Sequence, residues 1–119
     1  MKTILAVVGS RTFDDYELMK QELSKRDIDE IVSGGAFGAD KFAEQYAKEF
    51  NIPIKIFAAE WNLYGKRAGM IRNRVVVDYC SELIAFWNGF SKGTAHAIEC
   101  CNEFKRPHKI ILFKEPEKL

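Results

Sequence analysis

The amino-acid sequence predicts an α/β protein with one parallel β-sheet of about five strands and helices on both faces of the sheet. Short apolar runs typical of strands alternate with amphipathic runs typical of helices along the whole chain. No turn signal joins two strands directly, so hairpins are not expected. Because a helical run separates successive strands, the strands run parallel and right-handed crossovers cover both faces. This arrangement is a three-layer, doubly wound, Rossmann-like fold.

Length and composition are those of a single ordinary globular domain, residues 1–119. Hydrophobic residues make up 47% of the chain, which is enough to build a core. The formal net charge of +1 provides no overall field for holding a polyanion. Nucleic acid is therefore not the expected partner.

The cysteines and histidines indicate neither a disulfide framework nor a metal site. The three cysteines form no CxxC motif, and the two histidines lie far apart in the sequence. We therefore expect no metal and a location in the reducing cytoplasm. The apolar run Ile4–Val8 is too short for a signal peptide, and no run is long enough to span a membrane, so no membrane partner is expected.

Three strands are predicted in the first half of the chain. Ile4–Val8 is rich in β-branched residues, which is typical of a strand buried on both faces. Asp29–Ser33 is the second strand, and Ile52–Phe57 is the third. Between the first two, Asp14 or Asp15 caps a helix. The inner face of that helix contains Leu18, Met19, Glu22 and Leu23.

Two more strands and two helices are predicted in the second half. A helix runs from Arg72 to Tyr79, and Leu83–Trp87 is the fourth strand. A last helix ends before Pro107 and is followed by the strand Lys109–Phe113 and a charged tail that we expect to fray. The apolar face of that helix contains Thr94, Ala97, Ile98, Cys101 and Phe104.

A glycine-rich turn, Ser33–Asp40, joins the second strand to an amphipathic helix that runs to Phe50. Gly34 and Gly35 have no Cβ, so they permit positive φ and the close approach of a ligand. Backbone N–H groups at the start of a helix favour an anion. Asp40 either caps these N–H groups or accepts hydrogen bonds from ribose hydroxyls. The helix itself is predicted from the spacing of Ala39, Phe42, Ala43, Tyr46, Ala47 and Phe50.

Two further turns of small residues follow strands, Gly9–Phe13 after the first and Asn88–Thr94 after the fourth. The carboxyl ends of parallel strands meet at one edge of a sheet, so we expect all three turns to lie together there. Doubly wound folds bind their ligands at that edge. Arg11 is either a solvated loop residue or a fork for a phosphate or carboxylate.

The segment Ala58–Met70 mixes aromatic, cationic and glycine residues without helix or strand periodicity, which predicts an irregular loop. Aromatic and cationic groups together suit a flat base and its phosphates. Alternatively, Trp61 pins the loop to the core. The three valines at positions 75–77 indicate burial on more than one side of their helix, and we expect a homodimer or larger assembly through it.

Four motifs occur in order along the chain, Val8–Arg11, Ser33–Asp40, Ala68–Asn73 and Ala85–Thr94. Together they resemble the YspA/YpsA-related branch of the SLOG superfamily, which also contains the Smf/DprA proteins and the LOG phosphoribohydrolases. The resemblance covers nearly the whole chain and implies a Rossmann-like sheet that binds nucleotides or nucleotide-derived ligands. Many members have no assigned reaction, and some are proposed as sensors in bacterial or phage conflict systems.

The LOG enzymes cleave a nucleoside 5′-monophosphate into base and ribose phosphate with an arginine and a glutamate. In this chain His96 stands where the resemblance places their glutamate, and Asn73 stands where it places their arginine. The binding frame therefore carries over and the catalytic pair does not. The catalytic candidates that remain are Asp40, Glu60 and His96.

The leading hypothesis is a cytoplasmic binding domain for a nucleotide-type ligand, such as an ADP-ribose, NAD-related or mononucleotide species, that senses or sequesters it. The alternative is a divergent nucleotide N-glycosidase, and DprA-like binding of single-stranded DNA is less favoured. No other cofactor is expected. The expected ligand-binding residues are Gly9, Ser10, Arg11, Ser33, Gly34, Gly35, Gly38, Asp40, Trp61, Arg67, Gly69, Arg72, Asn73, Asn88, Gly89, Ser91, Gly93 and Thr94.

Overall fold

A computed structural model describes residues 2–115 and shows five strands in one parallel sheet. The strand order is β3-β2-β1-β4-β5, so the order reverses between β1 and β4. This is the doubly wound, Rossmann-like topology expected from the sequence. The strands are β1 (Ile4–Gly9), β2 (Glu30–Ser33), β3 (Ile54–Ile56), β4 (Glu82–Trp87) and β5 (His108–Leu112).

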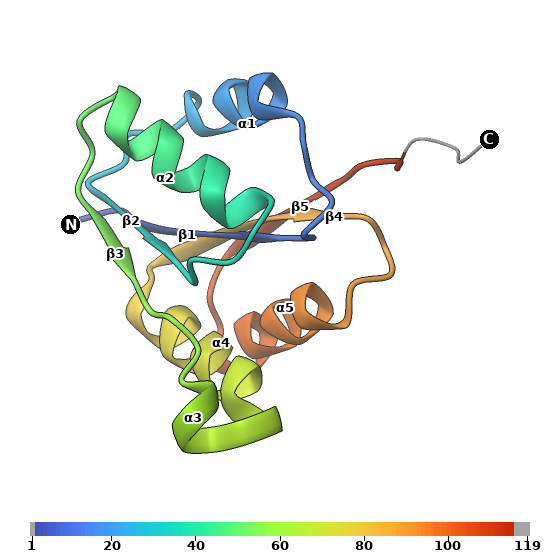
Figure 1. Cartoon of the computed structure of the whole chain (residues 1–119). Helices are drawn as coiled ribbons and strands as arrows, with labels where there is room; N and C mark the ends of the chain where they lie inside the picture. Colours follow the sequence, from blue (N-terminus) through green and yellow to red (C-terminus); the bar gives the residue numbers. More distant parts are fainter. Residues whose placement is uncertain (1, 116–119) are drawn as a thin grey trace.

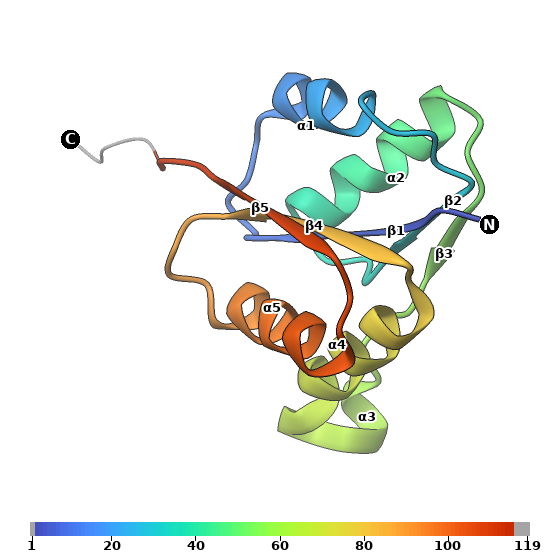
Figure 2. The same ribbon diagram turned by 180° about the vertical axis from the view of Figure 1, so that it is seen from behind.

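Helices cover both faces of the sheet, which makes three layers (Figure 1). Helices α1 and α2 lie on one face and α4 and α5 on the other, and the view from behind shows the same division (Figure 2). The short helix α3 lies beyond α4, away from the sheet. The helices are α1 (Tyr16–Leu23), α2 (Ala39–Glu49), α3 (Trp61–Tyr64), the 3-10 turn η1 (Gly65–Arg67), α4 (Ala68–Tyr79) and α5 (Lys92–Phe104).

The core is divided by the sheet into two apolar clusters. Leu5 and Val7 of β1 pack with α1 and α2, whereas Ala6 between them packs with α4 and α5. This alternation is the period of two that a strand imposes on its side chains. All three cysteines are buried without forming a disulfide, and they pack among apolar side chains on the α4–α5 face.

Most predicted elements are present with ends shifted by one or two residues. Asp15, not Asp14, caps α1, because its carboxylate accepts a hydrogen bond from the Leu18 N–H at 3.1 Å. Part of the charged tail predicted to fray lies in residues 116–119, outside the described residues. Within the described part of the chain, no helix is long and apolar enough to cross a membrane.

The segment Ala58–Met70 differs from its prediction, because it contains α3, η1 and the start of α4. Neither α3 nor η1 buries a side chain, so the sequence there lacks the periodic apolar residues from which a helix is predicted. Helix α4 begins at Ala68, four residues before the predicted Arg72. Gly69, a poor helix former in the first turn, made this start difficult to predict from the sequence.

The three valines of α4 have different surroundings. Val76 and Val77 are buried within the single chain, whereas Val75 is 41% exposed. The helix packs against the sheet and against α5 beside it, and these contacts account for two of the three valines. Assembly through α4 stays a prediction, for which Val75 and the exposed Met70 supply the apolar surface.

Gly9 allows α2 to approach the end of β1. A Cβ on Gly9 would lie 2.5 Å from the Phe86 carbonyl oxygen and 2.6 Å from the Ala39 Cβ, whereas a Cβ on Gly93 would meet nothing within 4 Å. We predict that Gly9→Ala lowers the free energy of unfolding by about 1–3 kcal/mol, the usual cost of overpacking. Gly93→Ala, the matched control, should leave it unchanged or raise it by about 0.5–1 kcal/mol through helix propensity. Urea unfolding measures both, and equal stability of the two variants would contradict this role of Gly9.

Candidate functional site

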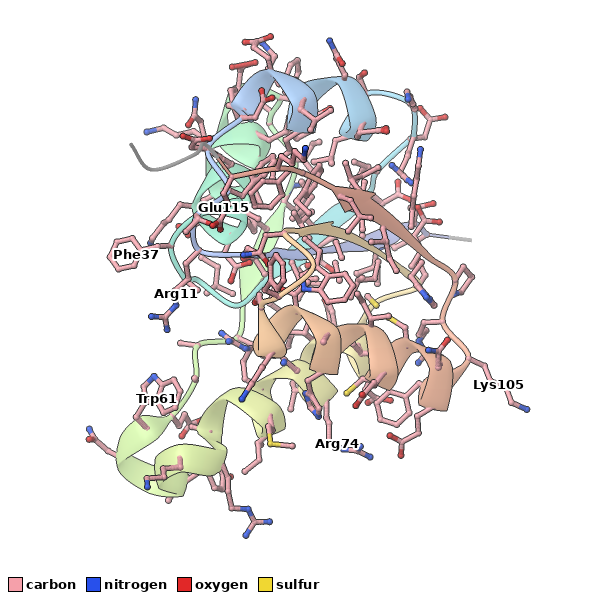
Figure 3. All side chains as sticks on the ribbon, turned by 90° about the vertical axis from the view of Figure 1, so that its right-hand side faces the viewer. Arg11, Phe37, Trp61, Arg74, Lys105 and Glu115 are labelled. Carbon is pink, nitrogen blue, oxygen red and sulfur yellow. The ribbon has the colours of Figure 1, made fainter. Side chains whose placement is uncertain are left out.

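A cavity of about 510 Å³ opens at the carboxyl ends of β1, β2 and β4. It lies where the strand order reverses, because loops on the two sides of this point leave the sheet toward opposite faces. The labelled side chains Arg11 and Trp61 lie on the same side of the molecule (Figure 3). The predicted site residues that line the cavity are Gly9, Arg11, Gly34, Asp40, Trp61, Gly69, Arg72, Asn73, Ser91, Gly93 and Thr94, together with His96.

The remaining predicted residues do not line the cavity, and several of them shape its turns instead. The Ser10 hydroxyl accepts a hydrogen bond from the Asn88 N–H at 3.1 Å, and the Ser33 hydroxyl accepts one from Gly35 at 3.3 Å. The Asn88 carboxamide oxygen accepts from two N–H groups of the next turn, each at 2.8 Å. Arg67 and Glu60 are exposed away from the lining. The predicted glycines that lie outside the lining all have positive φ, and they are Gly35, Gly38 and Gly89.

Seven lining residues were missing from the predicted set, and two of them are cations. Lys66 lies in η1, and Lys92 is the first residue of α5. Lys66 stood in the cationic segment of the sequence, and Lys92 stood in the third glycine-bearing turn, so both carried a local signal. The others show no signal, because small and apolar residues at these positions resemble core: Val8, Ala36, Met70, Val76 and Ala97.

Arg72 ties α4 to the glycine-rich turn after β2. Its Nη1 donates to the Gly34 carbonyl at 3.0 Å, and its Nε donates to the Asn73 Oδ1 at 3.2 Å. A Cβ on Gly34 would lie 2.2 Å from that Nη1, so this glycine makes room for the guanidinium. Of the two glycines expected to permit positive φ, Gly35 adopts it and Gly34 does not. The Nη2 group of Arg72 makes no hydrogen bond to the described protein and is free to donate to a ligand.

Asn73 and His96 contact each other in the cavity wall. The Asn73 Nδ2 donates to the Gly93 carbonyl at 3.1 Å and lies 3.2 Å from the His96 Nδ1. The orientation of this amide is fixed at both ends, because the Arg72 Nε can only donate and a carbonyl can only accept. The Asn73 Nδ2 therefore presents a donor to the His96 Nδ1. The positions that the resemblance assigns to the LOG catalytic pair thus hold an amide and an imidazole in contact with each other.

The amino end of α5 forms another wall of the cavity. The Ser91 hydroxyl accepts from the Thr94 N–H at 3.4 Å and lies 3.1 Å from the Thr94 hydroxyl, which fixes the start of the helix. The first N–H groups of a helix have no partner within it, so those of Lys92 and Gly93 face no intrahelical acceptor. Because no atom lies near the missing Cβ of Gly93, a ligand has space to approach this backbone.

Asp40 is the one carboxylate in the lining that the structure describes, whereas four lining residues are arginines or lysines. The Asp40 Oδ2 accepts from the Ala36 N–H at 3.0 Å, and the side chain is buried. Burial raises the pKa of Asp40 to about 6, against the opposing effects of the Ala36 N–H and of Arg72. The cavity therefore combines a cationic surface with one enclosed acidic group. The four cations are Arg11, Lys66, Arg72 and Lys92.

The comparisons with known proteins agree with this architecture. Residues 3–64 match the model of the YspA, cpYpsA-related SLOG family. Over 112 residues the chain is 33% identical to the Gene 61 protein of Mycobacterium phage D29, an alignment covering 82% of this chain and 86% of the phage protein. The chain belongs to the YspA, cpYpsA-related SLOG family. Membership in this family supports a nucleotide-related binding fold and confirms the resemblance seen in the four motifs.

A solved structure confirms the fold over almost the whole chain. DNA processing protein A from Helicobacter pylori, described for its mode of binding single-stranded DNA, superposes with a TM-score of 0.65 at 19% identity. The superposition covers 98% of this chain and 66% of the other, so the chain spans about two thirds of that protein. At this identity the likeness concerns the fold alone.

Asp40 makes stability depend on pH. Its pKa is higher in the folded protein than the ordinary value of 3.8, so the folded state holds its proton more tightly than the unfolded state does. This contribution is complete below about pH 4 and is lost as pH rises through about 6, a loss of about 3 kcal/mol. Urea unfolding from pH 4 to 8 should show the decline in wild type and not in Asp40→Asn. Parallel pH profiles for the two proteins would refute the raised pKa.

Proposed function

We propose that this protein is a binding domain for a nucleotide-derived small molecule, which it senses or sequesters. The observation that carries the proposal is the cavity at the reversal of strand order, where the amino end of α5, the glycine-rich turn before α2 and four cations converge. Doubly wound folds bind nucleotides at this place. A cavity of about 510 Å³ falls within the ordinary range for small-molecule sites.

The phosphate end of such a ligand would lie between α5 and Arg72. The free N–H groups of Lys92 and Gly93 and the positive end of the helix dipole favour a phosphate. Arg72 offers its remaining N–H groups from the opposite wall, and the open space at Gly93 permits close approach. The ligand classes that match are ADP-ribose, NAD-related species and mononucleotides.

The base end of the ligand would lie toward α3. Trp61 is 55% exposed and lines the cavity together with the apolar side chains of Met70 and Val76. An exposed indole offers a stacking face for a base, and Lys66 beside it adds a cation. Trp61 also lies over Gly69 of α4, whose Cβ would be 3.5 Å from the indole, but an indole this exposed does not pin the segment to the core as the alternative interpretation expected.

Arg72 provides the direct test of this proposal. We predict that Arg72→Ala weakens binding of the tightest ligand in a panel of ADP-ribose, NAD and nucleoside monophosphates by about 1.5–3 kcal/mol, the range for a charge-assisted hydrogen bond. Arg72→Lys should restore only part of the loss, because lysine has no planar fork. Isothermal titration calorimetry measures the affinities.

The matched control is Arg74→Ala on the same helix. Arg74 is exposed and pairs with Glu103 at 2.8 Å, outside the cavity lining, so its loss should leave affinity unchanged. A variant Arg72→Ala that unfolds more easily yet binds as tightly as Arg74→Ala would make Arg72 only a structural tie to Gly34. Absence of any binder in the panel would remove the proposed function itself.

The enzymatic alternative is the less well supported one. Cleavage of an N-glycosidic bond builds positive charge on the sugar, which a carboxylate stabilises. Neither Asn73 nor His96 supplies a carboxylate, and Glu60 lies outside the lining. Asp40 remains as the acid that such a reaction could use.

We accordingly predict little or no release of free base when nucleoside monophosphates are incubated with the purified protein for many hours. Chromatography of the mixture measures the release. The control is Asp40→Asn under the same conditions, because contaminating hydrolases would act equally in both samples. Robust release that disappears in Asp40→Asn would establish the enzyme and overturn the binding domain.

Single-stranded DNA is a second candidate ligand, on the strength of one surface feature. Phe37 and Phe90 are 72% and 87% exposed in the turns after β2 and β4, at the same edge of the sheet as Arg11 and Lys66. Exposed aromatics among cations are typical of single-strand binding surfaces. The net charge of +1 describes the whole chain, whereas this edge of the sheet carries the four cationic residues of the cavity lining. The structural neighbour from Helicobacter pylori binds single-stranded DNA, which gives the candidate its precedent.

A further inference from the structure

The carboxylate of Asp40 lies in a cavity that is otherwise cationic. An ionised carboxylate repels a phosphate, so its presence weakens binding of any ligand that offers it only anionic oxygens. A group of this kind in an anion-binding cavity is favourable where part of the ligand donates hydrogen bonds to it. Asp40 therefore favours ligands that have hydrogen-bond donors next to the phosphate over ligands that have only acceptors there.

Hydrogen bonds to the backbone use only part of the hydrogen-bonding capacity of the Asp40 carboxylate. An ionised carboxylate has about four acceptor sites. The Ala36 N–H donates to Oδ2 at 3.0 Å, and the Gly34 N–H also favours the ionised form. The side chain is only 6% exposed, yet it belongs to the cavity lining, so its remaining capacity is directed at the cavity contents.

Asp40 and Arg72 hold the same short segment of backbone. Arg72 donates to the Gly34 carbonyl, and Asp40 accepts from the Ala36 N–H two residues later. A phosphate bound by Arg72 therefore lies near Asp40. In a nucleotide the group attached directly to the phosphate is the sugar, whereas the base lies further away, toward Trp61 in the proposed orientation.

We propose that Asp40 reads the sugar, accepting hydrogen bonds from ribose hydroxyls, and that the cavity consequently selects ribonucleotide ligands over deoxyribonucleotide ligands. This inference rests on the proposed function and deepens it. A ribose presents two adjacent O–H donors, which a fixed carboxylate accepts as charge-assisted bonds. A deoxyribose lacks one of them and leaves the buried carboxylate without a partner. Single-stranded DNA is disfavoured for the same reason, because its sugars lack the 2′-hydroxyl and their 3′-oxygen is esterified to phosphate.

The experiment compares matched pairs of ligands at pH 8. Isothermal titration calorimetry measures the binding of the four nucleoside 5′-monophosphates and their 2′-deoxy counterparts to wild type, Asp40→Asn and Arg72→Ala. Wild type should prefer the ribonucleotide by about tenfold or more. Asp40→Asn keeps the shape and an acceptor for the Ala36 N–H, and it should reduce this preference at least fivefold. Arg72→Ala is the control, because it should weaken both members of a pair equally and leave their ratio unchanged.

The outcomes separate this inference from the proposed function. Equal binding of ribo and deoxy ligands by wild type, or a preference that survives in Asp40→Asn, overturns the sugar-reading role and leaves the nucleotide site standing. Binding of oligodeoxythymidylate more tightly than of any mononucleotide overturns it as well. If none of the eight nucleotides binds, and ADP-ribose and NAD do not bind either, both the inference and the proposed function fail.

Discussion

The reversal of strand order between β1 and β4 is the constraint on which the cavity depends. Helix α2 leaves the sheet toward one face and α5 toward the other, so no helix crosses the gap between their amino ends. Side chains of α4 and backbone of the turns then line this gap. The positive ends of two helices come together there without any long-range packing beyond that of the sheet itself. Gly9 sets the spacing, because only a glycine lets α2 lie against β1.

Arg72 converts this gap into a defined cavity. Its hydrogen bond to Gly34 joins α4, on one face of the sheet, to the turn that leads to α2, on the other. The Asn73 amide continues the connection to Gly93 of α5. Two segments from different parts of the sequence, the turn before α2 and the first turn of α5, are therefore held by neighbouring residues of a single helix. A ligand that bridges Arg72 and α5 would strengthen the same connection, which is how a binding event would be felt across the domain.

The sequence was sufficient to predict the fold and many of the residues that line the cavity, because both follow from the parallel direction of the strands. Once the strands are parallel, Gly9, Gly34 and Gly93 must lie at one edge, whatever the details of packing. It was insufficient where a residue's role depends on a distant partner. Ser10 resembled a ligand donor, but its hydroxyl accepts a hydrogen bond from the Asn88 N–H, which is distant in the sequence. Nothing local distinguishes Ser10 from Ser91, which does face the cavity.

The short helical segments α3 and η1 bury no side chain. Separating this segment from α4 exposes little apolar surface, so its local opening costs far less free energy than global unfolding. Trp61 and Lys66 lie on this segment, so under the proposed function we expect its opening, on the microsecond-to-millisecond timescale of such motions, to govern how fast a ligand enters and leaves. Under the proposed function, the turns at the sheet edge contribute to affinity alone, whereas the segment that carries Trp61 contributes both to affinity and to the rate of ligand exchange.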